Sequence, residues 1–226
     1  DKHLYHNRVP DHPGGGTVTW TNPWGGHQYF ADIEVREDGG TPAFLQTIKA
    51  ALAIRLKEQM GVATMRQRET EMMQALFAGL DDVPGLHLLA GEHRERLGVI
   101  SFYVEGLHFN LGVKLLNDRF GIQTRGGCSC AGTYGHYLLN ISPEISQQIT
   151  SQIDAGQLVN KPGWIRLSIH PTMTDDEVQR LLTGIDAVAR HCQAWGQDYR
   201  YRPQANDFVH RDGEVPLGPA VESWLA

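Results

Sequence analysis

Two cysteines stand close together in the glycine-rich segment Arg125-Gly126-Gly127-Cys128-Ser129-Cys130-Ala131-Gly132. A thiol in such a turn is accessible, and it becomes a nucleophile when Arg125 or the start of the following helix promotes its thiolate form. The alternative is that one or both cysteines are small buried residues beside a tight turn. A metal site is not expected, because Cys-x-Cys lacks the spacer of about two to four residues found in structural zinc sites.

A single cation interrupts an otherwise apolar strand in the segment Trp164-Ile165-Arg166-Leu167-Ser168-Ile169. Alternation along a strand places Arg166 on the same face as Trp164 and Ser168. A guanidinium group in this position requires a carboxylate, because an unpaired buried charge is costly and arginine offers a bidentate fork. The carboxylate would belong either to a ligand or to an internal ion pair, unless the arginine faces solvent.

A third candidate is the junction formed by Gly39, Gly40 and Thr41, which precedes an apolar helical pattern. The free N–H groups of a glycine loop that leads into a helix can bind an anion. A helix cap without a ligand is the commoner use of this sequence, with Thr41 as the N-cap and Pro42 at the first helical position.

The patterns that position these residues alternate between helix and strand. Helices are predicted from 42 to 60, from about 65 to 80, near 108–119 and 142–155, and after a capping box at 174–177. Strands are predicted at 98–104, 121–125 and 163–170. We expect an α/β protein in which residues 1–60 are loops plus a helix, 61–192 form a small α/β domain, and 193–226 are an irregular C-terminal extension.

The composition excludes several classes of partner. The net charge is -6 and no cluster of lysine and arginine occurs, so binding to nucleic acid or to an anionic membrane surface is not expected. The three cysteines are sparse, and neither a signal peptide nor an apolar run of membrane-spanning length is present. These features are typical of a cytoplasmic protein.

The ordered set of segments 36–42, 125–131 and 166–172, followed by the capped helix, resembles the class V aminotransferases, and especially the cysteine desulfurases and selenocysteine lyases. The resemblance covers roughly residues 10 to 190. It implies the C-terminal part of a homodimeric fold-type I transferase that uses pyridoxal phosphate (PLP), with residues 1–60 belonging to the large cofactor domain. It further implies that Thr41 with Gly40 contacts the PLP phosphate across the dimer interface, that Cys130 forms the persulfide, and that Arg166 binds the carboxylate of an amino-acid substrate.

The chain departs from this family in ways that concern the site. The desulfurases carry Thr where this chain has Gly126, they lack a counterpart of Cys128, and their chain between the cysteine and the arginine is shorter. The family's Schiff-base lysine would precede Asp1, and none of Lys2, Lys49, Lys57, Lys114 and Lys161 has the family context. We therefore expect the 226-residue chain to lack the cofactor anchor and to be inactive by itself.

Three functions follow from these observations. The first is a desulfurase or selenocysteine lyase that passes sulfur or selenium through Cys130, with a sulfur-acceptor protein as a possible partner. The second is a class V aminotransferase or other PLP lyase that does not use this cysteine. The third, from a different class, is a free-standing redox or binding module that uses Cys128 and Cys130.

Overall fold

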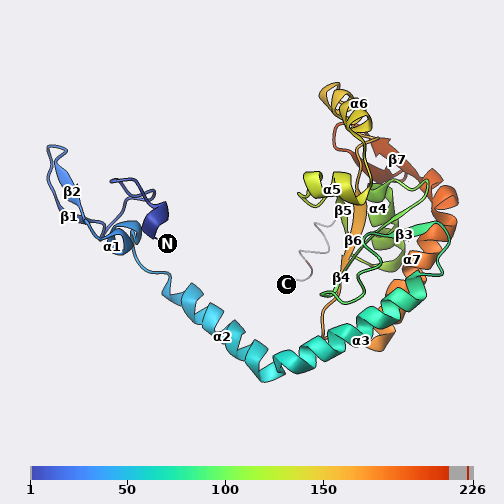
Figure 1. Cartoon of the computed structure of the whole chain (residues 1–226), viewed down its shortest axis with the longest axis horizontal. Coiled ribbons are helices and arrows are strands. Elements are labelled where there is room, and N and C mark those ends of the chain that lie inside the picture. Colours follow the sequence, from blue (N-terminus) through green and yellow to red (C-terminus); the bar gives the residue numbers. More distant parts are fainter. Residues whose placement is uncertain (1, 214–222, 224–226) are drawn as a thin grey trace. The chain divides into compact units, whose positions relative to one another are not determined.

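The structure of the chain is a computed structural model that describes residues 2–213 and residue 223 (Figure 1). The chain divides into two units, Asp1–Val62 and Ala63–Ala226. Within the described residues, no helix has both the length and the apolar composition needed to cross a membrane.

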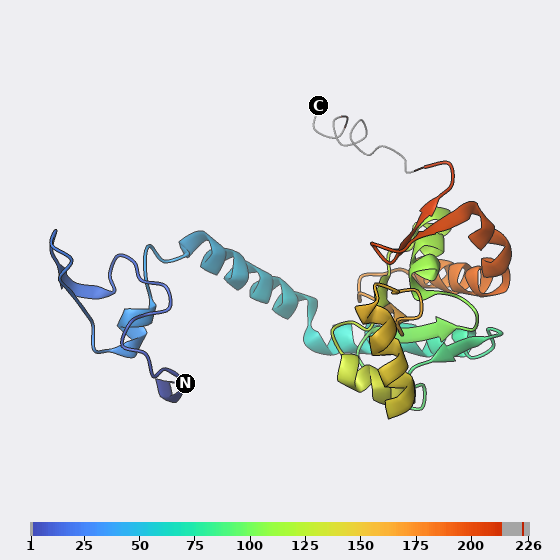
Figure 2. The same cartoon turned by 90° about the horizontal axis from the view of Figure 1, so that it is seen from above.

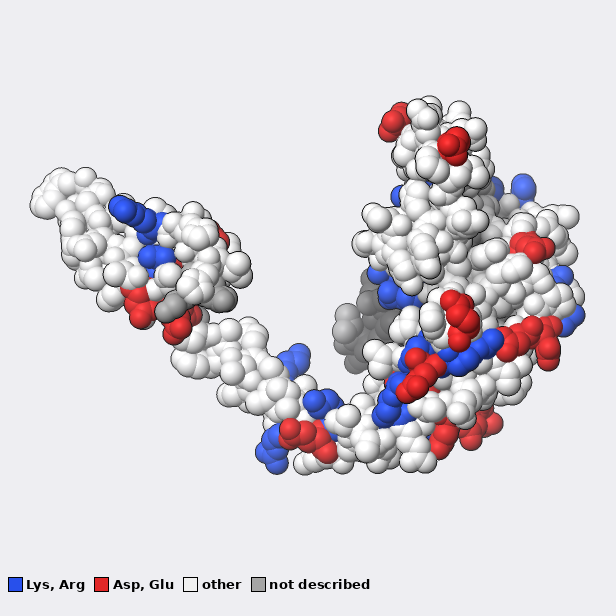
Figure 3. All heavy atoms as spheres, viewed as in Figure 1, with Lys and Arg blue, Asp and Glu red and all other residues white. Residues whose placement is uncertain are grey.

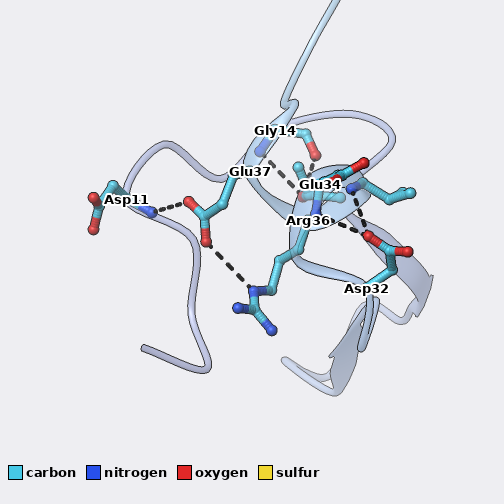
Figure 4. A network of polar contacts seen from close by, with 8 residues as sticks. Asp11, Gly14, Asp32, Glu34, Arg36 and Glu37 are labelled. Atoms are coloured by element: carbon cyan, nitrogen blue, oxygen red, sulfur yellow. Dashed lines mark hydrogen bonds and ion pairs between the residues drawn. The ribbon is translucent and has the colours of Figure 1, made fainter. Parts of the chain in front are cut away.

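The first unit is built from turns and short elements. Its elements are the 3-10 helix η1 (Lys2–Leu4), the antiparallel strands β1 (Val18–Thr21) and β2 (His27–Tyr29), the short helix α1 (Ile33–Glu37) and the long helix α2 (Phe44–Met60). The side chain of Asp32 caps α1 by accepting hydrogen bonds from the N–H groups of Glu34 and Val35 at 2.8 and 3.3 Å (Figure 4). Polar contacts therefore hold this unit where a large apolar core is lacking.

The loop that carries Gly39 and Gly40 is held against the turn at residues 14–17. The N–H group of Gly40 donates to the carbonyl of Gly15 at 2.8 Å, and Gly40 has a φ of +89°. A Cβ atom on Gly39 would lie 2.6 Å from the carbonyl oxygen of His12, so only glycine fits there. Gly40 supplies the backbone conformation with positive φ, and Gly39 permits the close approach of its backbone to the carbonyl of His12.

The expected N-cap at Thr41 is wrong. Helix α2 begins at Phe44, its N-cap is Ala43, and no side chain caps it. Because Gly40 is tied to Gly15 and the N–H of Phe44 donates to the carbonyl of Pro42 at 2.8 Å, the chain turns once more before the helix starts. None of the residues of α2 is buried, and its large apolar side chains from Phe44 to Leu56 are exposed in the described chain.

The second unit contains the larger part of the regular structure. Its helices are α3 (Val62–Leu80), α4 (Phe109–Phe120), α5 (Gly132–Leu138), α6 (Pro143–Asp154), α7 (Asp175–Trp195) and the 3-10 helix η2 (Gly196–Asp198). Its strands are β3 (Leu86–Leu88), β4 (Val99–Val104), β5 (Arg125–Gly127), β6 (Trp164–Ser168), β7 (Tyr199–Arg202) and β8 (Asp207–His210). Four of them form an antiparallel sheet in the order β3-β4-β6-β5.

Helices cover one face of this sheet and form the core with it (Figure 2). Side chains alternate along the two central strands, so that Ile100, Phe102 and Val104 of β4 are buried together with Ile165 and Leu167 of β6. They pack against apolar residues of α3, α4 and α7, which are Met72, Leu76, Leu80, Leu115, Leu116, Leu181, Ile185 and Val188. The alternate residues of the same strands, including Arg166, are left for the opposite face.

Most of the expected elements are present, with two differences. The capping box of Thr174 and Glu177 begins α7 as expected, and the helices near 108–119 and 142–155 occur as α4 and α6. The strand expected at 121–125 lies instead at Arg125–Gly127, because α4 continues to Phe120 and ends at Gly121 with a left-handed φ of 67°. Residues 193–213 are not irregular as expected, since they continue α7 and then form the hairpin β7–β8; of the rest of the expected extension, only residue 223 lies within the described residues.

The C-terminal hairpin packs over the start of α4 through His108. The ring of His108 lies 5.2 Å from that of Phe208 and 5.9 Å from that of Tyr201, measured between centroids. Its Nδ1 accepts a hydrogen bond of 3.1 Å from the N–H of Asn110, so the imidazole is the N-cap of α4. Burial lowers the pKa of His108, against a smaller opposite effect of the Asn206 side chain. The cap therefore requires a neutral imidazole.

The stability of the chain is expected to fall as the pH is lowered through the titration of this histidine. Because the folded state disfavours protonation, the contribution of His108 is complete above its unfolded pKa of about 6.5 and is lost progressively below it. His108→Asn keeps a capping acceptor that does not titrate, so its melting temperature should fall less between about pH 7.5 and 5.5. His108→Ala should lose about 1 kcal/mol at neutral pH. Equal pH dependence in the wild type and in His108→Asn would contradict the assignment.

Candidate functional site

Two arginines lie side by side at one level of the sheet. Arg166 of β6 is directly opposite Arg125 of β5 on one side and Ser101 of β4 on the other. Directly opposed residues of antiparallel strands project from the same face. Since Ile165 and Leu167 enter the core, the row of Ser101, Arg166 and Arg125 projects from the face opposite to α3, α4 and α7.

These two guanidinium groups lack the carboxylate partners that several other arginines of the described chain have. Arg68 pairs with Asp175 at 2.7 Å, and Arg94 pairs with Asp81 at 3.0 Å. On the face of the second unit shown in Figure 3, basic and acidic side chains lie next to one another in this way. Among the described residues, neither Arg125 nor Arg166 forms an ion pair, and the buried Nε of Arg166 has no hydrogen-bond partner.

Arg125 is exposed to solvent, so the cost of lacking an anion falls mainly on the half-buried Arg166. Like charges directly opposite each other destabilise a sheet, and a buried donor without a partner costs about 1 to 3 kcal/mol. The internal ion pair, one of the three readings that the sequence left open for Arg166, is not formed within residues 2–213 and 223. A carboxylate is the planar anion that guanidinium groups bind with paired hydrogen bonds, so a ligand carboxylate remains the candidate partner of Arg166.

The segment after β5 is a tight turn that displays Cys130. The N–H of Ala131 donates to the carbonyl of Cys128 at 2.9 Å, and both intervening residues have positive φ, 52° at Ser129 and 59° at Cys130. Positive φ at both central residues is typical of a type I′ turn. For residues other than glycine this conformation costs roughly 1 to 2 kcal/mol each. Local strain of this kind often occurs at functional sites.

The three cysteines have different surroundings. Cys130 is exposed, and its Sγ accepts a hydrogen bond of 3.5 Å from Nη2 of Arg125. Cys128 is half-buried and lines an apolar cavity of about 120 Å³ between α5, α6 and the start of β6, whose wall includes Trp164 and Ile149. Cys192 is buried in α7 as part of the core. Arg125 thus stands between the Cys130 sulfur and Arg166, which is opposite it on β6.

Close packing of α4 holds this edge of the sheet in place. A Cβ atom on Gly126 would lie 2.6 Å from Oδ1 of Asn110 and 3.1 Å from side-chain atoms of Phe109 and Val113. The glycine that departs from the family pattern at this position lets α4 pack closely on β5, and a larger residue would force these side chains to shift. On the other side of the turn, His136 of α5 contacts the hydroxyl of Ser146 on α6 at 2.8 Å, so the two helices of the longer connection are linked.

The structure brings together only some of the residues expected to form the site. Cys130 and Arg166 are linked through Arg125, as the register and the Arg125–Cys130 hydrogen bond show. Thr41 and Gly40 belong to the other unit; Thr41 is exposed, and the Gly40 N–H is already bonded to Gly15. Among the described residues, no group of three or more His, Cys, Asp or Glu side chains is arranged to hold a metal ion.

Sequence reasoning missed the role of Arg125 beside Arg166, of Ser101 in the same row, and of the cavity beside Cys128. The pairing of Arg125 with Arg166 depends on strand register, and residues separated by 41 positions carry no local signal of it. The cavity depends on how α5 and α6 fold back on Trp164. A hint was available in the cluster of Arg125, Cys128 and Cys130 within one short segment.

Curated relatives of the chain are cysteine desulfurases. A cysteine desulfurase of Shigella flexneri is 27% identical over 193 residues, which cover 80% of this chain and 39% of that protein. One from Escherichia coli is 28% identical over a match of the same extent. A probable cysteine desulfurase of Staphylococcus epidermidis is 27% identical over 130 residues. The chain thus spans about two fifths of the length of the desulfurases from Shigella and Escherichia.

Solved structures of low sequence identity share the fold. The apo cysteine desulfurase of Thermococcus onnurineus matches with a TM-score of 0.55 at 23% identity, covering 80% of this chain and 39% of that one. A cysteine desulfurase of Escherichia coli matches with a TM-score of 0.57 at 18% identity and the same coverage. The family model described as "Aminotransferase class-V" matches residues 2–181. The chain therefore belongs to the class-V aminotransferase family and has the fold expected from its sequence.

Proposed function

We propose that this chain is the C-terminal portion of a PLP-dependent, cysteine desulfurase-like enzyme in which Arg166 binds the substrate carboxylate and Cys130 receives its sulfur. The observation that carries the proposal is the pair of arginines without carboxylates, one of which donates a hydrogen bond to an exposed thiol. The arrangement supplies a carboxylate site and a sulfur nucleophile within one segment of the fold. The names of the relatives support cysteine as the amino acid.

The residues of this chain act on the substrate side of the reaction. Arg166, aided by Arg125, fixes the carboxylate and so orients the rest of a small amino acid toward the turn. The Cys130 sulfur then attacks the sulfur of the substrate. The new S–S bond forms as the carbon–sulfur bond of the substrate breaks, and its electron pair stays with the carbon, which becomes the methyl group of alanine after protonation. When bound, PLP supplies the electron sink that makes this cleavage possible.

Four of the five lysines lie in surroundings that form no site for PLP within the described residues. Lys49 and Lys57 lie in α2, where no side chain is buried, and Lys114 pairs with Asp118 at 3.6 Å. Lys161 stands before β6 at the wall of the apolar cavity. We therefore propose that the lysine lies in another part of a longer protein, that residues 1–60 belong to its large domain, and that this chain alone does not turn over substrate.

Further features of the proposal come from the family rather than from the geometry. Thr41, with Gly40 shaping its loop, would contact the PLP phosphate of the partner subunit in a cytoplasmic homodimer. Selenocysteine is a second candidate substrate, and a sulfur-acceptor protein would collect the product from Cys130. An aminotransferase or lyase that does not use Cys130 is the alternative that the experiments on the thiol distinguish.

Arg166→Ala in the full-length, PLP-loaded protein should raise KM for cysteine by the equivalent of about 1.5 to 3 kcal/mol, the value of a hydrogen bond to a charged group. Arg166→Lys should recover only part of this loss, since lysine lacks the planar fork. Arg190→Ala is a matched control, because Arg190 is exposed and pairs with Asp186 on α7. A KM for Arg166→Ala equal to that of the control would show that Arg166 does not bind the substrate.

Cys130→Ala should abolish the protein-bound persulfide formed from cysteine while leaving the absorbance of bound PLP unchanged, because only the nucleophile is removed. Persulfide is detected by mass spectrometry of the alkylated protein. Cys192→Ala is the control for loss of a thiol, since Cys192 is buried in the core, and it should still form the persulfide. Undiminished turnover of an amino acid by Cys130→Ala would favour the aminotransferase alternative.

A further inference from the structure

Cys128 and Cys130 occupy the first and third positions of one closed turn. The turn is fixed by the 2.9 Å hydrogen bond from Ala131 N–H to the Cys128 carbonyl and by the positive φ values of Ser129 and Cys130. Two Cα atoms that flank one left-handed residue lie roughly 5 to 6 Å apart. Disulfides join Cα atoms about 4.4 to 6.8 Å apart, so the backbone of this turn suits an S–S bond between the two cysteines.

The surroundings of the two thiols differ in a way that suggests different roles. Cys130 is exposed and held by Arg125, so an incoming sulfur donor meets it first. Cys128 is half-buried against the apolar cavity below α5 and α6, where it is shielded from large reagents. It is nevertheless attached to the same short turn, which gives it a high effective concentration toward Cys130.

The turn has this curled shape while both cysteines are free thiols. The conformational freedom that ring closure would otherwise remove is therefore already lost in the reduced chain. The turn keeps this conformation although it places Ser129 and Cys130, neither of which is glycine, at positive φ. A turn that held only one reactive thiol would not need its two cysteines in these positions.

We propose that Cys128 is a resolving thiol for a persulfide on Cys130. The Cys128 thiolate attacks Sγ of Cys130, the Cys128–Cys130 bond forms, and the bond between Sγ of Cys130 and its outer sulfur breaks. The outer sulfur leaves with the electron pair as hydrosulfide, so it is reduced while the two cysteines are oxidised to a disulfide. A dithiol reductant returns the pair to thiols by exchange. The inference rests on the proposed role of Cys130 and adds that the sulfur leaves as sulfide.

The test uses the 226-residue chain under anaerobic conditions, with inorganic polysulfide as the source of sulfur. Trypsin cleaves after Arg125 and not between Lys161 and Pro162, so one peptide, residues 126–166, holds both cysteines and excludes Cys192. The wild-type peptide should appear as an internal disulfide, lighter than the dithiol by a pair of hydrogens, with release of sulfide. Dithiothreitol should restore the dithiol.

Three variants make the result specific. Cys128→Ser should retain a stable persulfide on Cys130, and it should not release the sulfide that the attack of Cys128 sets free. Cys192→Ala should behave as the wild type. Cys130→Ser should form no disulfide. If the wild-type peptide keeps the added sulfur, as a persulfide or a trisulfide, the resolving role is wrong. Because polysulfide replaces the substrate, that result would not contradict cysteine desulfuration by the full-length protein. Likewise, a full-length protein that does not desulfurate cysteine would not contradict the resolving role of Cys128.

Discussion

The candidate site depends on two arginines that project from the same level of adjacent strands, with no carboxylate of the described residues paired to them. A folded protein normally pairs such charges, as this chain does with Arg68, Arg94 and Arg190. Arg125 is exposed to solvent, whereas the buried Nε of Arg166 has no hydrogen-bond partner, which is unfavourable in the isolated fold. Unpaired donors of this kind favour the binding of an anionic ligand, since they are already in position and need little reorganisation.

The register that brings the arginines together depends on packing on the other face of the sheet. Ile165 and Leu167 anchor β6 in the core, and the close packing of α4 against Gly126 holds β5 beside it. A shift of one residue in either strand would turn its arginine toward the core. The turn at Cys130 begins directly after β5, so the position of the thiol follows from the same contacts.

Regular elements with strong local signals could be predicted from the sequence. The capping box at Thr174, the alternation around Arg166 and the helical pattern after residue 108 all led to elements that the structure contains. The start of α2 was misplaced because the link between Gly40 and Gly15, which delays the helix, joins segments 25 residues apart. The hairpin β7–β8 was missed although it has its own cross-strand contacts, and it also packs on His108 at the start of α4, far away in the sequence.

Residue types suggested Cys130 and Arg166 individually, whereas their connection through Arg125 required the strand register. The central claim is that this connection forms a carboxylate site, and nuclear magnetic resonance of the Arg166 side chain tests it most directly. Titration of the ¹⁵N-labelled chain with L-alanine should shift the buried Nε–H signal of Arg166 saturably, with a dissociation constant of roughly 10 mM or weaker. Ethylamine, which lacks the carboxylate, should leave the signal in place. An equal shift with both compounds, or none with alanine, would contradict the account.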